Sequence, residues 1–132
     1  YMDLDNFKLV NDAHGHRCGD DLLRDIGKML SVGTRTGDLV ARLGGDEFAL
    51  WLEEADEAAA LTKTHEFIEK SKKWCHLSKD ENRLLGISIG VVVSKNDEIK
   101  TVDELVALAD AAMYEVKHKG KGGVIVANRS DR

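Results

Sequence analysis

The segment Arg42-Leu43-Gly44-Gly45-Asp46-Glu47-Phe48 joins a glycine pair to an acidic pair and is the strongest guide to the architecture of this chain. The two glycines favour a tight backbone turn, with no side chain to obstruct a phosphate, and two carboxylates follow at once. The flanking segments 39–43 and 47–52 are largely apolar, so they are expected to pair as a hairpin around the glycines. The segment therefore predicts acidic side chains at the end of a β-hairpin.

A second acidic pair, Asp3 and Asp5, lies at the end of the first apolar strand, which is expected at 1–4. An acid at a strand end is often only a solvated turn residue. If the two strands are neighbours, however, Asp3 and Asp46 converge, and a bound Mg²⁺ would relieve the repulsion between them. Two strand ends that carry carboxylates are what a divalent-metal site for phosphoryl transfer requires.

Helices and strands alternate along the rest of the chain. Helices are expected at 7–13, 20–30, 56–75 and from 101 to the glycine at 120, and strands at 1–4, 39–43, 47–52, 84–93 and 124–126. This order favours an α/β (α+β) fold, in which helices pack on one sheet, and the hairpin makes that sheet mixed. A doubly wound nucleotide-binding fold is less favoured, because no G-x-G-x-x-G follows a strand.

Composition limits the classes of function. The chain has 132 residues, enough for one domain, and its 24 acidic and 19 basic residues give a net charge of −5. This charge argues against a general nucleic-acid binder. No apolar run approaches the roughly 20 residues of a membrane span. Cys18 and Cys75 give no disulfide framework, which fits a reducing compartment. Since Tyr1 is not a natural start, we expect the chain to be a piece of a longer protein.

Asn11 and Asp20 are candidates for recognition of a purine base. An amide offers a donor and an acceptor, and a carboxylate accepts from two donors. Guanine presents N1–H and N2–H₂ donors beside acceptors at O6 and N7, so the pair would accept guanine and reject adenine. The alternative is that both residues cap helices, which is a strong reading for Asp20 because it precedes the apolar position Leu22.

Three lysines, Lys117, Lys119 and Lys121, surround Gly120 at the expected end of a helix. Cations are common at helix C-termini, where they are solvated. A pair of such lysines would also suit a clamp on a triphosphate. The sequence alone leaves both readings open.

Two further groups are weaker signals. Arg35 and Asp38 form either an exposed ion pair of little value or contacts to the base and phosphate of a second ligand. His14, His16 and Cys18 are possible zinc ligands, but their spacing matches no closed zinc motif and a fourth ligand would have to come from far away. We therefore expect His16 to brace the loop between two glycines instead.

Taken together, these motifs closely resemble the GGDEF domain of diguanylate cyclases, over nearly all 132 residues. The resemblance rests on Asp3-Leu4-Asp5-Asn6-Phe7-Lys8, Asn11-Asp12, Gly15-His16, Gly19-Asp20, the segment 42–48, Ser88-Ile89-Gly90, and Ala109-Asp110-Ala111-Ala112-Met113-Tyr114 with Lys117. A five-residue glycine-acid motif alone has little specificity, but these blocks occur in the family's order and spacing. Residues 1–132 are accordingly expected to form one GGDEF domain, truncated at its N-terminal side.

The resemblance implies a cyclase-like palm, a central and mainly antiparallel sheet flanked by helices. It implies an enzyme that condenses two GTP molecules into cyclic di-GMP and two pyrophosphates across a homodimer of facing domains, each holding one GTP. Two Mg²⁺ ions are the expected cofactors, with Mn²⁺ as a substitute. Sensor domains, and in some relatives a phosphodiesterase domain, would share the parent chain. No nucleic-acid partner is expected, and the location would be cytoplasmic, in a parent protein with or without a membrane anchor.

The resemblance also implies roles for individual residues. The metal ligands would be Asp3, the carbonyl of Leu4, Asp46 and Glu47, with Asp46 and Glu47 as the catalytic acids. Glu47 would be either a further ligand or an aid to deprotonation of the ribose 3′-OH. Guanine would be read by Asn11 and Asp20, and the phosphates would be held by backbone near Phe7 and Lys8, by the turn at Gly44 and Gly45, and by Lys117 and Lys121. Arg35 and Asp38 match the family's R-x-x-D site for inhibition by the product.

Some features depart from the family. Its usual upstream helix lies outside this chain, Gly122-Gly123 replaces an expected asparagine region, and Lys121 stands where arginine is frequent. The main alternative is therefore an inactive GGDEF domain that senses GTP or cyclic di-GMP, although every acid and glycine of the turn is present. A palm-type nucleic-acid polymerase is a third alternative, which the negative charge and small size disfavour.

Overall fold

The computed structural model describes residues 1–95 and 101–127. Its helices are α1 (Phe7–His14), α2 (His16–Val32), α3 (Glu57–Ser71), the 3-10 helix η1 (Lys72–Ser78) and α4 (Val102–His118). Its strands are β1 (Met2–Asp5), β2 (Leu39–Gly44), β3 (Glu47–Trp51), β4 (Gly86–Val91) and β5 (Val124–Val126). The predicted order of helices and strands is therefore confirmed.

The five strands form one sheet in the order β2-β3-β1-β4-β5. Strand β1 pairs antiparallel with both β3 and β4, and β2 pairs antiparallel with β3. The pairing between β4 and β5 is parallel, and α4 makes the crossover between them. The sheet is thus mixed and mainly antiparallel, as expected.

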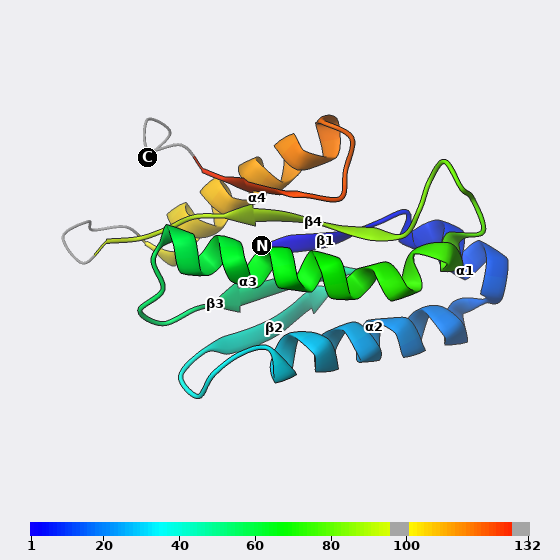
Figure 1. Cartoon of the computed structure of the whole chain (residues 1–132), viewed down its shortest axis with the longest axis horizontal. Helices are drawn as coiled ribbons and strands as arrows, with labels where there is room; N and C mark the ends of the chain where they lie inside the picture. The colour runs from blue at the N-terminus through cyan, green and yellow to red at the C-terminus, as the bar shows by residue number, and fades with distance from the viewer. Residues whose placement is uncertain (96–100, 128–132) are drawn as a thin grey trace.

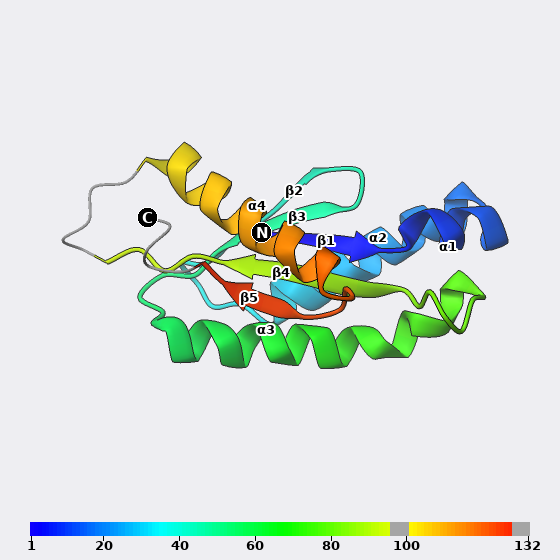
Figure 2. The ribbon, with the colours of Figure 1, turned by 90° about the horizontal axis from the view of Figure 1, so that it is seen from above.

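Helices cover both faces of this sheet (Figures 1 and 2). Helices α2 and α3 lie on one face, and α4 lies on the other, where it packs on β4, β5 and β1. Met2 and Leu4 of β1 are buried in the core beneath α2 and α3. Because side chains alternate along a strand, Asp3 and Asp5 point to the face that α4 partly covers.

The boundaries differ from the prediction at the α1–α2 corner. Helix α2 begins at His16, so Asp20 lies inside the helix and does not cap it. Gly15, at φ +91°, makes the turn between the two helices alone. Gly19 lies within α2, where the lack of a side chain lets Asn11 of α1 pack closely against the helix. A Cβ at this position would overlap Asn11 Oδ1.

The other helices differ in how their ends are capped. Asn6 precedes α1 in a left-handed conformation, at φ +63°, and its side chain makes no capping hydrogen bond. Asp56 caps α3 by accepting from the amide of Ala59. The predicted long helix 56–75 ends at Ser71 and continues as η1. Helix α4 begins as predicted after residue 101, where the Thr101 hydroxyl caps it by accepting from the Glu104 amide.

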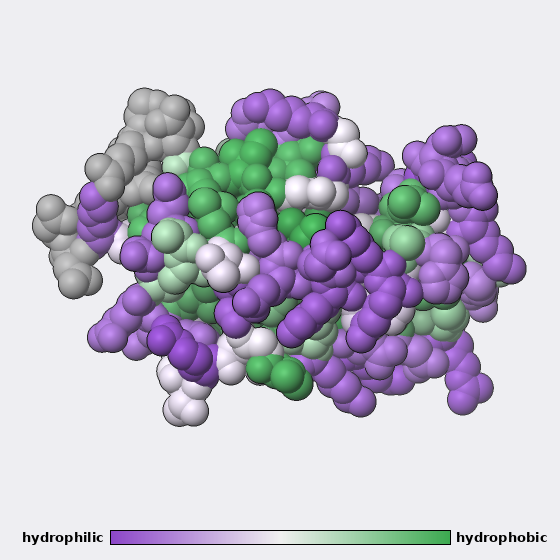
Figure 3. All heavy atoms as spheres, in the orientation of Figure 1, coloured by the Kyte–Doolittle hydropathy of each residue, from purple (hydrophilic) through white to green (hydrophobic). Residues whose placement is uncertain are grey.

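The surface in the orientation of Figure 1 is hydrophilic over α3, and hydrophobic atoms gather above it (Figure 3). Strand β5, at the edge of the sheet, is only half-buried. Within residues 1–95 and 101–127, no helix has the length and apolar character needed to cross a bilayer.

Candidate active site

The glycine turn between β2 and β3 places the acids of β3 beside β1. Gly44 and Gly45 have φ values of +141° and +49°, in the range that glycine adopts without strain. The turn is held by a hydrogen bond from Arg42 Nε to the carbonyl of Gly45, 3.0 Å long. Asp3 and Glu47 are direct cross-strand partners, so their side chains share the face of the sheet on the α4 side.

Asp3 and Asp46 lie together, as the sequence predicted. The two carboxyl groups are close enough for the charge of Asp46 to act on Asp3, and the Leu4 amide donates to the Asp46 carbonyl at 3.2 Å. Burial and the charge of Asp46 raise the pKa of Asp3 to about 6, and Lys117 opposes that rise. Asp3 Oδ1 is buried and has no hydrogen-bond partner. A carboxylate with an unused oxygen beside a second carboxylate suits a divalent cation.

Glu47 is turned toward a different partner. The Tyr1 hydroxyl donates to Glu47 Oε2 at 3.2 Å. Over the described ranges 1–95 and 101–127, no three His, Cys, Asp or Glu side chains are grouped to hold a metal ion, and this holds for His14, His16 and Cys18 as well. Of the four predicted metal ligands, the Asp3 and Asp46 carboxylates and the Leu4 carbonyl therefore lie together, and Glu47 is bound to Tyr1. This donor set fits Mg²⁺, which binds one or two protein carboxylates and completes its shell with water and substrate phosphates.

Asp5 and Lys117 form a buried polar cluster next to the acids. Asp5 is 2% exposed, and it accepts from the Ser88 hydroxyl at 2.7 Å, the Lys117 ammonium at 3.1 Å and the Gly122 amide at 2.9 Å. Lys117 also reaches the Leu4 carbonyl at 3.3 Å and Asp3 Oδ2 at 3.5 Å. Lys117 is thus bound to the acidic cluster and is not a solvated lysine at a helix end.

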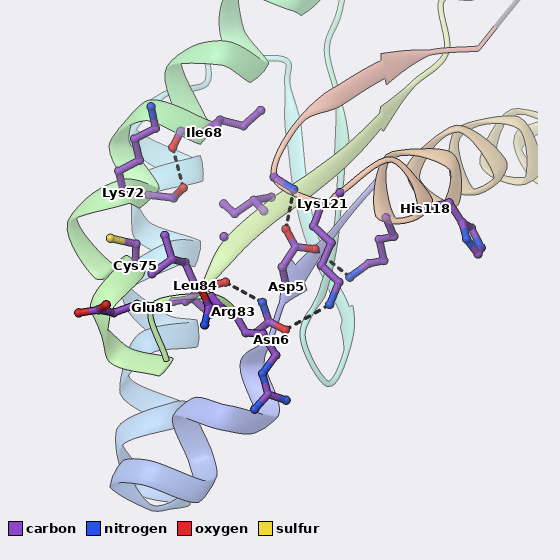
Figure 4. Close-up of a pocket in the computed structure, with 18 residues that line it drawn as sticks. Asp5, Asn6, Ile68, Lys72, Cys75, Glu81, Arg83, Leu84, His118 and Lys121 are labelled. Atoms are coloured by element: carbon purple, nitrogen blue, oxygen red, sulfur yellow. Dashed lines mark hydrogen bonds and ion pairs between the residues drawn. The ribbon is translucent and has the colours of Figure 1, made fainter. Parts of the chain in front are cut away.

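Lys121 and Asn6 brace the loop that follows α4. Lys121 Nζ donates to Asn6 Oδ1 at 3.2 Å, and Asn6 Nδ2 donates to the Leu84 carbonyl at 2.8 Å (Figure 4). Both residues border a cavity of about 690 Å³ between η1, the start of β4 and this loop. Asp3 and Asp46, which are both half-buried, are not among the residues that line this cavity.

The candidates for guanine recognition lie at the α1–α2 corner. Asn11 lies on α1 and packs against Gly19 of α2, and the neighbouring Asp20 is exposed. Asn11 Oδ1 is buried without a hydrogen-bond partner. Phe7 is half-buried at the start of α1, and Lys8 is exposed. The helix-cap alternative is wrong for both Asn11 and Asp20, because each lies inside a helix.

Arg35 and Asp38 occupy the loop before β2. Asp38 accepts from the amides of Arg35 and Glu53, both at 2.9 Å, and these bonds lower its pKa. The Arg35 guanidinium donates to the Glu53 carbonyl at 2.7 Å, and its side chain is 72% exposed. Asp38 therefore fastens the loop to the strand β3 end, a role that the sequence did not indicate, and Arg35 remains accessible.

The family described as "Diguanylate cyclase, GGDEF domain" matches residues 1–123. The chain belongs to this family.

Known GGDEF proteins are similar to this GGDEF domain in both sequence and structure. MucR from Pseudomonas aeruginosa, described as a bifunctional diguanylate cyclase/cyclic di-GMP phosphodiesterase, is 41% identical over 123 residues, which are 93% of this chain and 18% of MucR. The solved GGDEF domain of TpbB (YfiN) from the same organism is 35% identical, with a TM-score of 0.84 over 98% of this chain and 76% of that one. The GGDEF domain of DgcB from Caulobacter crescentus, solved with cyclic di-GMP, is 26% identical, with a TM-score of 0.82 over 96% and 74% of the two chains. The chain therefore spans less than a fifth of the length of MucR.

Sequence reasoning gave no role to two residues of this GGDEF domain, Asp5 and Ser88. Asp5 was grouped with Asp3 only as a neighbouring acid, and Ser88 only as part of a motif in an apolar strand. A signal was present, since a serine in a strand that is buried on both faces needs a polar partner. The partner could not be identified, because strand order is not written in the sequence.

Proposed function

We propose that this GGDEF domain is a diguanylate cyclase, which joins two GTP molecules into cyclic di-GMP and releases two pyrophosphates. The observation that supports this most is the proximity of Asp3 to Asp46, in which one buried carboxylate oxygen has no hydrogen-bond partner among residues 1–95 and 101–127. A metal–triphosphate complex supplies the partner that this oxygen lacks. Family membership favours the same reaction.

Each side chain then has a defined task. Asp3, the Leu4 carbonyl and Asp46 would hold the divalent ions, and Mg²⁺ fits these oxygen ligands best, with Mn²⁺ as a substitute. When bound, such an ion lowers the pKa of the ribose 3′-hydroxyl and neutralises charge on the α-phosphate and leaving pyrophosphate. Glu47 lies on the same face of the sheet as Asp3, where it would accept the hydroxyl proton or act as a further ligand.

The substrate would lie across the open face between the glycine turn and the α1–α2 corner. Gly44 and Gly45 leave room for the phosphates, which the amides near Phe7 and Lys8 and the ammonium groups of Lys117 and Lys121 would bind. Asn11 Oδ1, which is buried and unpartnered, would accept from guanine, and Asp20 would bind its remaining donors. Adenine would be rejected because it lacks the same donors.

Bond formation requires two such domains. The 3′-oxygen of each GTP forms a bond to the α-phosphorus of the facing GTP, so two bonds form, and the bond from each α-phosphorus to its pyrophosphate breaks. The acids of one domain are only half-buried, so a second domain would enclose the reacting groups and hold them in line. The domain would act in the cytoplasm, where GTP is available, as one part of a longer signalling protein.

The direct test is incubation of the domain with GTP and Mg²⁺, followed by separation of the products by chromatography. We expect cyclic di-GMP, formed at a rate that rises faster than linearly with protein concentration. Asp46→Asn should abolish product, because a neutral amide binds Mg²⁺ poorly, whereas Asp25→Asn, at an exposed position on α2, should leave the rate unchanged. Production by Asp46→Asn at the wild-type rate would overturn the assignment.

Product inhibition is a second part of the proposal. Arg35 is accessible, and both oxygens of Asp38 are engaged by loop amides, so Arg35 would supply the principal contact to bound cyclic di-GMP. Wild-type protein should be inhibited by added cyclic di-GMP, and Arg35→Ala should be inhibited much less. Equal inhibition of the two proteins would refute this site.

The alternative is a regulatory module that binds GTP or cyclic di-GMP without turnover. MucR is described as a bifunctional diguanylate cyclase/cyclic di-GMP phosphodiesterase, and such a module would act beside a phosphodiesterase domain in the parent chain. The same incubation at high protein concentration distinguishes the two functions. A domain that binds GTP but forms no cyclic di-GMP would be a regulatory module.

A further inference from the structure

Lys117 contacts two of the groups that the proposed function assigns to a metal ion, the Asp3 carboxylate, through Oδ2, and the Leu4 carbonyl. Its ammonium lies 3.3 Å from the Leu4 carbonyl, 3.5 Å from Asp3 Oδ2 and 3.1 Å from Asp5 Oδ1. An ammonium has three protons, and three oxygens surround it. Two of these three oxygens belong to the candidate metal ligands, and only that of Asp5 does not.

From this arrangement, and resting on the proposed function, we propose that Lys117 is a tethered cation that competes with the divalent metal for Asp3 and the Leu4 carbonyl until a triphosphate draws its ammonium away. A lysine and a divalent ion cannot share these ligands closely, because like charges at contact distance repel strongly. The metal-free protein therefore keeps its acids partly neutralised by its own side chain.

The anchor of Lys117 makes exchange possible without movement of the backbone. Helix α4 is fixed on β4, since a Cβ at Gly90 would overlap the backbone of Ala109 and Met113. The lysine extends from the last turn of this fixed helix, and its four-carbon stem has free rotation about several bonds. Its side chain is 23% exposed, so its outer side faces the solvent from which a triphosphate would arrive.

Asp5 limits how far the ammonium moves. This carboxylate is held by the Ser88 hydroxyl and the Gly122 amide, so it stays in place when the metal ligands change partners. Asp5 therefore keeps Lys117 beside the metal ligands after it has released them, in position to bind a phosphate. Asp5 acts as a positioning residue for Lys117, and not as a metal ligand.

Competition of this kind makes metal and nucleotide binding cooperative. The triphosphate removes the lysine from the shared oxygens, and this removal strengthens metal binding. By linkage, the metal must strengthen triphosphate binding by the same factor. Metal alone would bind weakly, which keeps the acids from being blocked by a cation in the absence of substrate.

The test is binding of Mn²⁺ alone to the isolated domain, measured by electron paramagnetic resonance, with no nucleotide present. Lys117→Met removes the ammonium and keeps most of the stem, so Mn²⁺ should bind about tenfold more tightly than to wild type. Lys119→Met removes the same charge two residues away, where Lys119 pairs with the exposed Glu115, and should bind Mn²⁺ as wild type does. Asp3→Asn, introduced together with Lys117→Met, should abolish the gain and thereby locate the ion.

Each outcome is decisive. Equal or weaker Mn²⁺ binding by Lys117→Met, with measurable binding by wild type, would overturn the competition and leave the metal site intact. Absence of Mn²⁺ binding in all variants, including Lys117→Met, would overturn the competition and the metal site together. A melting temperature for each variant shows whether it is folded. A purely structural role for Lys117 predicts lower stability and looser metal binding, which is opposite to the expected gain.

Discussion

The substitution Asp5→Asn tests how much the buried cluster beside the acids contributes to the free energy of unfolding. Asp5 accepts three hydrogen bonds, from Ser88, Lys117 and Gly122, and it is nearly inaccessible to water. Asparagine has the same size, but it has no charge and replaces one acceptor oxygen by an NH₂ donor. That donor must face either the Gly122 amide or the ammonium and hydroxyl on the other side.

The expected cost follows from these contacts. One buried donor left without an acceptor costs about 1–3 kcal/mol, and the remaining bonds weaken because they lose their charge assistance. We therefore expect Asp5→Asn to lower the free energy of unfolding by about 2–4 kcal/mol. A domain of this size is stabilised by about 5–15 kcal/mol, so the variant should still fold.

Urea denaturation followed by circular dichroism measures this loss, at neutral pH and with an unchanged dependence on urea. Asp25→Asn removes an exposed charge and serves as the control, with an expected change within about 0.5 kcal/mol. In a double-mutant cycle, Ser88→Ala should cost much less in the Asp5→Asn background than in wild type. A loss from Asp5→Asn no larger than that of the control, or full additivity with Ser88→Ala, would refute the reasoning.

Three further predictions concern pH, metal and packing. In metal-free protein, folding raises the pKa of Asp3 to about 6, so protonated Asp3 favours the folded state. The contribution of Asp3 to the free energy of unfolding is therefore lost as pH rises from about 4 through 6. Urea titrations should show this loss in wild type and not in Asp3→Asn. Mg²⁺ should raise the melting temperature more at pH 7.5 than at pH 5.5, since protonated Asp3 binds metal poorly; equal shifts at the two pH values would exclude Asp3 as a ligand. Gly90→Ala should lower the free energy of unfolding by about 3 kcal/mol or more, because the added methyl meets α4 backbone, whereas Gly15→Ala meets no atom and should show only the smaller strain of its positive φ.

The fold was predictable because its signals are local. The glycine pair at 44–45 defines the hairpin, alternation of apolar and acidic residues defines β1, and alternation of large apolar and small residues defines β4. The errors lie where a tertiary contact overrides a local rule. The second helix is predicted to begin at Asp20, but α2 begins at His16 and includes Gly19, against which Asn11 packs closely. The end of α3 is likewise decided by η1, which has no distinctive sequence.

The candidate site was predictable only in part. Convergence of Asp3 and Asp46 followed from their strands being neighbours, which a resemblance to a known family suggests and the sheet order shows. The partners of Lys117 were not predictable, because they depend on how far α4 extends over β1. The bond between Tyr1 and Glu47, and the use of Asp38 to fasten its loop, are equally long-range facts.

Asp3 and Asp5 show why residue type alone does not define a site. They stand two residues apart on one strand and point to the same face, so local sequence gives them the same role. The surroundings separate them. Asp5 faces a hydroxyl, an amide and an ammonium, which satisfy both of its oxygens, whereas Asp3 faces a second carboxylate and keeps one oxygen without a partner. A divalent cation would therefore complete the contacts of Asp3, whereas Asp5 has partners for both oxygens within the protein. Two of those partners, Ser88 and Gly122, are far from Asp5 in sequence.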